Sequence, residues 1–110
     1  MSYEIIATKK FRSSLKQLRK RYHSIDEDFE RLVGELERQP ILGIALGRGC
    51  YKIRMRIAAK NIGKSGGARV ITCVRIINQQ VFLLAIYDKL EQESISDNER
   101  DELLRGSGLL

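Results

Sequence analysis

The sequence predicts an α+β fold: a helix hairpin packs on one face of a four-stranded, mainly antiparallel sheet, and a short C-terminal helix follows. Three observations support this prediction. Apolar residues recur at helical spacing between Thr8 and Pro40, the spacing changes to strict alternation at Tyr51, and two stretches rich in β-branched residues follow at 69–77 and 81–87. A chain of 110 residues has room for one hydrophobic core, so we expect residues 1–110 to form a single domain.

The N-terminal half predicts a short strand at residues 3–7 and then the two helices. Thr8 can cap the first helix, and Ser24 with Glu27 has the spacing of a capping box that opens the second. Pro40 ends the second helix, because the residue before a proline is pushed out of the helical region. The apolar faces of the two helices are Phe11, Leu15, Leu18 and Tyr22, and then Ile25, Phe29, Leu32, Val33 and Leu36. The very short turn between the helices predicts an antiparallel hairpin.

The C-terminal half predicts the rest of the sheet. A glycine-rich loop at 43–49 precedes the alternating strand 51–57, and a flexible turn at 61–67 separates that strand from the next. The two β-branched stretches are the last two strands. Ser96 and Glu99 form a second capping box, which opens a helix that runs through Leu104 and stops at Gly106.

Positive charge is concentrated in the middle of the chain. Residues 48–89 contain nine Lys and Arg against one Asp, whereas residues 90–110 contain two against six acidic residues. A segment this basic favours a polyanionic partner, with nucleic acid the leading candidate, although a basic surface that only aids solubility would show the same composition.

Composition also limits the compartment and the cofactors. No apolar run is long enough to span a bilayer and the N-terminus lacks the order of a signal peptide, so we expect a cytoplasmic protein with no membrane partner. Cys50 and Cys73 should be free thiols in that reducing compartment, and Cys73 should pack as a small apolar residue. With one histidine and no metal-ligand spacing, we expect no metal and no cofactor.

The alternating strand places several cations on one face of the sheet. Lys52, Arg54 and Arg56 occupy its even positions, while Tyr51 has the parity of the core and should pack there. Arg69 and Arg75 share one parity on the next strand, and Lys89 lies just past the last one. Like charges crowded on one face repel each other and lower folding stability. Binding of an RNA phosphodiester would explain why the cations are kept together.

RNA cleavage by its own 2′-hydroxyl needs a proton acceptor, a cationic site for the phosphate and a proton donor for the leaving oxygen. His23 lies at the turn between the helices, where we expect an ordinary surface histidine. Lys52 is the candidate acceptor, because neighbouring cations such as Arg54 disfavour its protonated form. Arginines stay charged and suit phosphate binding.

Three stretches of the chain resemble the RelE family of toxins. Residues 50–54, Cys-Tyr-Lys-Ile-Arg, are similar to a characteristic strand of that family. Residues 63–71, Gly-Lys-Ser-Gly-Gly-Ala-Arg-Val-Ile, resemble the hairpin of its HigB-like branch, and Ile86-Tyr87-Asp88-Lys89 with Glu91-Gln92-Glu93 resembles the end of its last strand. The predicted element order agrees, so the resemblance covers nearly the whole chain.

The resemblance implies a ribonuclease that cleaves messenger RNA on translating ribosomes and is silenced by a cognate antitoxin. Its catalytic residues would be Lys52, Arg54, Arg69 and, by a looser match, Lys89 as the proton donor. The family's late tyrosine has no counterpart at Ser94 or Ile95. Tyr87, at the end of the last strand, is the candidate substitute. We expect the surrounding RNA-binding residues to be Arg56, Lys60, Lys64, Arg75 and Tyr87.

Three other interpretations each account for part of the sequence. Gly63-Lys64-Ser65 resembles part of a P-loop, but position 58 is alanine where that motif needs glycine, and a strand follows where it needs a helix. A ParE-like toxin would share the fold and act on DNA gyrase without the basic catalytic set. A non-catalytic module could use the same basic face to hold RNA or an acidic partner.

Overall fold

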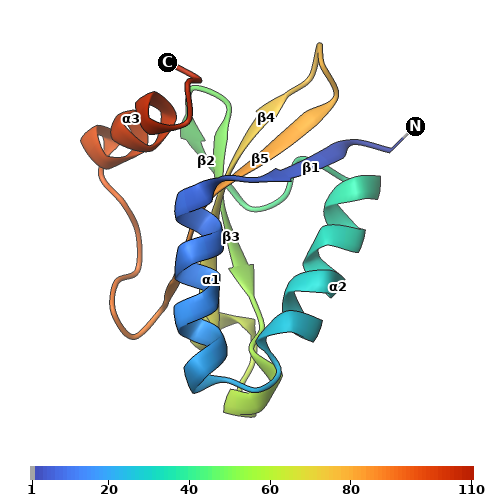
Figure 1. Cartoon of the computed structure of the whole chain (residues 1–110), viewed down its shortest axis with the longest axis vertical. Coiled ribbons are helices and arrows are strands. Elements are labelled where there is room, and N and C mark those ends of the chain that lie inside the picture. The colour runs from blue at the N-terminus through green and yellow to red at the C-terminus, as the bar shows by residue number, and fades with distance from the viewer. Residues whose placement is uncertain (1) are drawn as a thin grey trace.

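The computed structural model describes residues 2–110 as a curved sheet with helices on both faces (Figure 1). The elements, in chain order, are β1 (Glu4–Ala7), α1 (Lys9–Arg21), α2 (Ile25–Arg38), β2 (Ile44–Gly47), β3 (Cys50–Met55), the 3-10 turns η1 (Ala58–Lys60) and η2 (Lys64–Gly66), β4 (Ala68–Arg75), β5 (Gln80–Asp88) and α3 (Asp97–Gly106). The α+β class and the helix hairpin are therefore confirmed.

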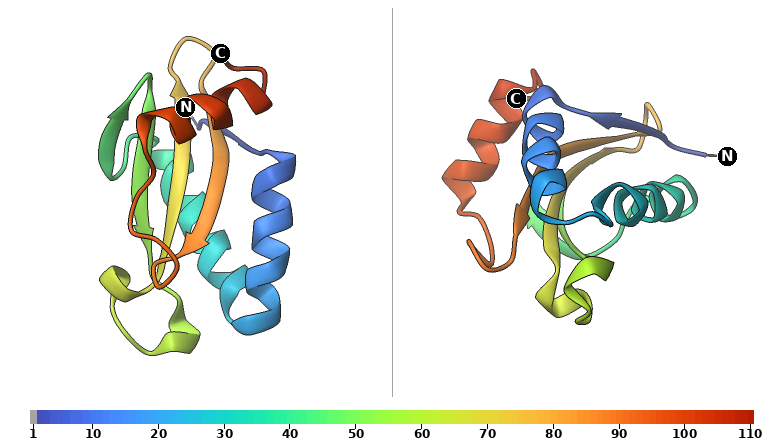
Figure 2. Two further views of the ribbon diagram at one scale, coloured as in Figure 1. Left: turned by 90° about the vertical axis from the view of Figure 1, so that its left-hand side faces the viewer. Right: turned by 60° about the horizontal axis from the view of Figure 1, so that its bottom comes forward.

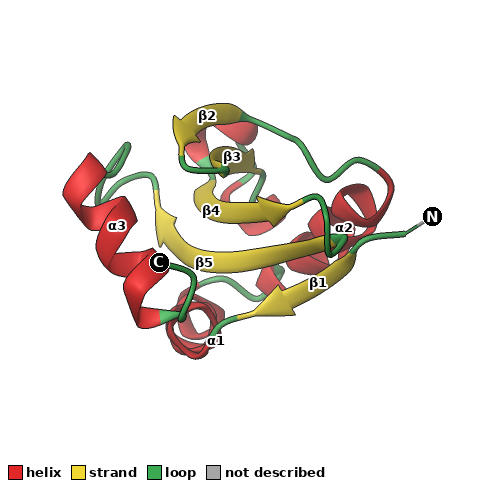
Figure 3. Cartoon of the chain, turned by 90° about the horizontal axis from the view of Figure 1, so that it is seen from above, coloured by secondary structure: helices red, strands yellow, loops and turns green. Residues whose placement is uncertain are grey.

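The sheet has the strand order β1-β5-β4-β3-β2 (Figure 3). All neighbouring strands are antiparallel except β1, which runs parallel to β5. The prediction of four strands was wrong, because β2 lies in the stretch expected to be a glycine-rich loop. Gly47 and Gly49 have positive φ angles and form the tight turn into β3, so the glycines make a hairpin rather than an open loop.

The two faces of the sheet carry separate apolar clusters. One cluster lies under α1 and α2 and includes Phe11, Leu15, Leu36, Ile53 and Val70. The other lies under α3 and is smaller, consisting of Cys50, Ile71, Cys73, Leu84 and Leu104 as its buried members. The alternation in β3 divides its side chains between the two faces, and Tyr51 packs against the larger cluster, as its parity predicted.

The two cysteines are free thiols on β3 and β4. They stand opposite each other in the strand register and both are buried, with Cys73 packed among apolar residues as expected. No helix among residues 2–110 is both long and apolar enough to cross a membrane.

Two of the three predicted helix N-caps form as the local sequence indicated. The Thr8 hydroxyl accepts the backbone N–H of Phe11, and Ser96 with Glu99 forms the full capping box of α3. The capping box predicted at Ser24 is absent: Ser24 is the N-cap residue, but its hydroxyl donates to Asp28 and accepts the N–H of Ala59 instead. The start of α2 therefore anchors η1, and tertiary contact replaces the local cap.

Candidate functional site: a cationic row across three strands

Four proposed site residues form a row on the face of the sheet that carries α3. Arg54 of β3 stands directly opposite Arg69 of β4, and Arg69 stands opposite Tyr87 of β5. Lys52 is two residues before Arg54 on the same strand and hence on the same face. The structure thus brings together Lys52, Arg54, Arg69 and Tyr87, which we call the cationic row.

Arg69 is the most enclosed member of the cationic row. Its side chain is 1% exposed, and Nη2 donates to the Ser65 carbonyl at 3.0 Å and to the Glu93 carboxylate at 3.0 and 3.3 Å. Nη1 has only long contacts of 3.3–3.4 Å to the carbonyls of Ala68 and Lys64. Nε has no hydrogen-bond partner in the part of the chain that the structure describes. A buried cation with spare donors is well suited to bind an anion.

The turn before β4 is shaped to hold this guanidinium. The η2 turn points the carbonyls of Lys64 and Ser65 at Arg69. Gly67 then lets the backbone pass close to the end of β3, because a Cβ at this position would overlap the carbonyl oxygen of Met55. Its own carbonyl accepts the backbone N–H of Lys89, which joins the ends of β4 and β5.

A buried ionic cluster formed by Asp88, Lys60 and Tyr22 anchors the same turn. Asp88 is fully buried and accepts the Tyr22 hydroxyl at 2.5 Å, the Lys60 ammonium at 2.6 Å and the N–H of Leu90 at 3.0 Å. Lys60 also donates to the Gly66 carbonyl. Burial alone would raise the pKa of Asp88, but the hydrogen bonds from Lys60 and Tyr22 outweigh it and hold that pKa below its ordinary value. The ionised carboxylate thus links α1, the turn 60–66 and the end of β5.

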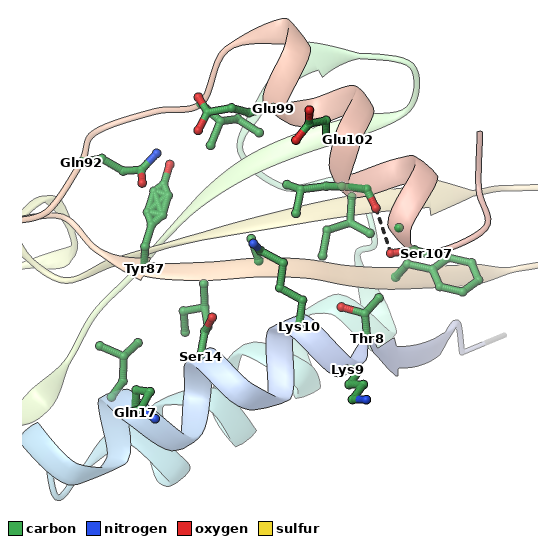
Figure 4. A pocket seen from close by; sticks show the side chains of 18 of the residues that line it. Thr8, Lys9, Lys10, Ser14, Gln17, Tyr87, Gln92, Glu99, Glu102 and Ser107 are labelled. Carbon is green, nitrogen blue, oxygen red and sulfur yellow. Dashed lines mark hydrogen bonds between the residues drawn. The ribbon is translucent and has the colours of Figure 1, made fainter.

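Tyr87 lies at the end of the cationic row and points toward Gln92 (Figure 4). Burial raises the pKa of its phenol to about 12. The hydroxyl therefore stays protonated near neutral pH, and it donates to the Glu93 carbonyl at 3.4 Å. It can donate a hydrogen bond or present its ring, but it cannot accept a proton as a base in that range.

The remaining predicted residues divide into two groups. The side chains of Arg56, Lys64 and Lys89 are exposed around the same end of the sheet. Lys60 was expected on the RNA-binding surface, but its ammonium is turned inward onto Asp88 and its side chain is 7% exposed. Arg75 has the expected parity, but it lies at the far end of β4, where it donates to the Leu109 carbonyl. We therefore leave Lys60 and Arg75 out of the proposed surface.

The sequence reasoning missed Glu93 and Asp88. Neither belongs to a paired carboxylate motif, and each meets its partners only through folding. His23 is exposed at the helix turn, as expected. Among residues 2–110, no three His, Cys, Asp or Glu side chains gather as a metal site would require.

A cleft of about 800 Å³ lies beside the cationic row, between α1, β5 and α3 (Figure 4). Lys9, Lys10 and Arg21 line its α1 side. Glu91, Glu99 and Glu102 line the opposite side, and Tyr87 belongs to both the cleft and the row. The cleft therefore has a basic wall and an acidic wall.

Comparison with known proteins identifies relatives of this architecture. A free double mutant of the Escherichia coli toxin RelE superposes with a TM-score of 0.57 at 20% identity, covering 98% of this chain and 96% of that one. The toxin–antitoxin complex RelBE2 of Mycobacterium tuberculosis gives 0.61 at 23% identity, covering 80% and 92%. The intact E. coli RelBE complex gives 0.58 at 21%, covering 79% and 96%. These similarities establish the fold.

The family model described as the RelE toxin of the RelE/RelB toxin–antitoxin system matches residues 4–108. This match includes every element described above, from β1 to α3. The chain belongs to the RelE toxin family.

Proposed function

We propose that this protein is an endoribonuclease that cleaves messenger RNA on the translating ribosome and so inhibits translation. The observation that carries the proposal is the placement of Arg54 directly opposite Arg69, with Lys52 on the same face. Like charges directly opposite each other destabilise a sheet. An RNA phosphodiester bound across them would turn that repulsion into attraction.

The residues of the cationic row divide the proposed chemistry among them. Arg54 and Arg69 hold the non-bridging phosphate oxygens and stabilise the charge of the pentacoordinate transition state. Lys52 takes the proton from the 2′-hydroxyl, and the exposed Lys89 protonates the leaving 5′-oxygen. The ring of Tyr87 stacks on a neighbouring base, or its protonated hydroxyl donates a hydrogen bond to the phosphate. The RNA supplies the nucleophile, and no cofactor is needed.

Alanine variants of Lys52, Arg54 and Arg69 test the assignment. Loss of one donor to a transition-state oxyanion costs about 10²–10³ in rate, so each variant should relieve growth arrest and slow cleavage to that extent. The matched control is Lys20→Ala, which removes an exposed lysine of α1. Circular dichroism should show that every variant is folded. If all three folded variants cleave like the control, the cationic row is not the active site.

The nucleophile can be tested on the RNA itself. Replacing the 2′-hydroxyl with hydrogen at the nucleotide before the cut should abolish cleavage. The upstream product should end in a 2′,3′-cyclic phosphate or its 3′-phosphate, and chelation of divalent ions should leave chemistry intact once the ribosome complex has assembled. A 3′-hydroxyl product from a 2′-deoxy substrate would refute this mechanism. Supercoiling inhibition would instead indicate a gyrase toxin, and binding without turnover a non-catalytic module.

We further propose a cognate antitoxin as the protein partner, as in the RelBE complexes. Leu104 is the one fully buried residue of α3. The helix also packs through Leu103 and is tied to β2 and the turn after it by the Arg100 bond to the Leu46 carbonyl and the Arg48–Asp101 ion pair. An antitoxin segment could cover the cationic row or take the place of α3. Co-expression with the adjacent reading frame should yield a complex in which the chain no longer cleaves RNA. Recovery of no neutralising partner would contradict the proposal.

A further inference from the structure

Residues 90–95, which we call the strap, lie in the connection from β5 to α3 and run in front of the sheet on the side of the cationic row (Figure 2, left). Its residue Glu93 makes three contacts to that row. The carboxylate accepts from Arg69 Nη2, and the backbone carbonyl accepts the Lys52 ammonium at 3.3 Å and the Tyr87 hydroxyl at 3.4 Å. One residue of the strap thus engages three of the four members of the row.

The position of the Glu93 carboxylate is the position an RNA phosphate would need. Arg69 is 1% exposed, and the other oxygens around its guanidinium are backbone carbonyls of the chain next to it. Glu93 is its one side-chain partner among residues 2–110. A carboxylate and a phosphate both offer anionic oxygens to the same N–H donors. A phosphate can therefore reach Arg69 only where Glu93 has left.

The strap is built to let Glu93 leave. The Glu93 side chain is 54% exposed, so the freed carboxylate returns to water, while the incoming phosphate replaces it as the partner of the buried Arg69. The ends of the strap are anchored separately: the N–H of Leu90 bonds to Asp88, Glu91 pairs with Arg21, and Ile95 packs on the smaller apolar cluster. The middle of the strap can move while both ends stay in place.

We propose that Glu93 is a residue of the RNA site, an internal phosphate mimic that occupies Arg69 in the free protein and is exchanged for the scissile phosphate. This inference rests on the proposed function, since the competing ligand is RNA. Glu93 then sets the affinity of the site: it shields the buried cation from weak anions, and an RNA that also engages Lys52 and Arg54 displaces it. The strap moves with it, which uncovers the cationic row.

The variant Glu93→Gln tests the proposal, and Glu91→Gln is its matched control. Both changes remove one negative charge from the same exposed segment, but Glu91 pairs with Arg21 rather than with the cationic row. The probe is a fluorescently labelled RNA oligonucleotide with 2′-O-methyl groups throughout, which can bind but cannot be cleaved. We expect Glu93→Gln to bind it about three- to tenfold more tightly than the wild type, the range of a partly exposed ion pair with one buried partner.

A second measurement follows the strap without RNA. Hydrogen exchange of the amides in the strap should be faster in Glu93→Gln than in the wild type, while exchange in β3 and β4 stays unchanged. Equal affinities of the two variants for the probe, or weaker binding by Glu93→Gln, would overturn the proposal. Cleavage of unmodified messenger RNA on translating ribosomes separates this outcome from failure of the ribonuclease assignment. If the wild type cleaves it but the variants bind alike, only the strap inference is wrong. If nothing is cleaved but Glu93→Gln alone binds more tightly, only the assigned chemistry is wrong.

Discussion

Replacing Asp88 with asparagine should destabilise the protein by about 3 kcal/mol. The carboxylate is fully buried and accepts three hydrogen bonds, two of them from the Lys60 ammonium and the Tyr22 hydroxyl. Removing one partner of a buried ion pair costs about 3–5 kcal/mol, because the other charge stays buried and unpaired. Asparagine retains one acceptor oxygen, so we take the lower end of that range. For a domain of this size the loss corresponds to roughly 12 °C in the melting midpoint.

The assay is thermal and urea unfolding followed by circular dichroism, since the chain has no tryptophan to report by fluorescence. A double-mutant cycle with Lys60→Met isolates the pair: the double variant should lose clearly less stability than the two single losses together. Asp26→Asn is the control, because Asp26 and its partner Arg19 are both about half exposed, and its midpoint should hardly change.

The contribution of Asp88 to folding stability should decrease in acid. The folded pKa of Asp88 lies below its ordinary value, so the stability it contributes is fully present above about pH 4, the ordinary range of an aspartate. It is lost as the pH falls through the folded pKa. The difference between the wild type and Asp88→Asn should therefore be constant from pH 5 to 7 and shrink in stronger acid. A variant as stable as the wild type, or a strictly additive cycle, would refute the role of Asp88 as an anchor.

Three further substitutions test the packing around the site, each by unfolding followed by circular dichroism. Thr72→Val should stabilise the protein by about 1 kcal/mol, because its buried hydroxyl has no hydrogen-bond partner among the described residues; a loss of stability would indicate an unseen partner. Gly67→Ala should cost about 2–3 kcal/mol because its methyl would overlap the Met55 carbonyl, and wild-type stability would show that the turn relaxes freely. Ser96→Ala should cost about 1 kcal/mol through loss of the α3 cap, and an unchanged midpoint would mean that packing alone holds this helix.

Much of the candidate site could be predicted from local patterns. Alternation predicted Lys52 and Arg54 on one face of β3 and gave Arg69 and Arg75 one parity on β4, because side chains on a strand alternate with period 2. The register of the two strands then places Arg69 opposite Arg54. The same reasoning did not decide which cations are free. Lys60 and Arg75 are basic residues of the same segment as Lys64 and Arg69. In the fold, however, Lys60 pairs with Asp88, and Arg75 lies at the far end of β4. The composition gives the number of charged residues but does not show which of them form ion pairs.

Local patterns were enough to predict the two helices of the hairpin, the strand periodicity, the caps at Thr8 and Ser96, and the concentration of cations at 48–89. Each of these depends on residues within a few positions of one another. Two contacts became visible in the folded chain alone: Glu93 pairs with Arg69, 24 residues away, and Asp88 bonds to Tyr22 and Lys60, 66 and 28 residues away. A long-range polar contact forms because the sheet and its connections bring distant segments together, and the conformational preferences of neighbouring residues carry no information about that arrangement.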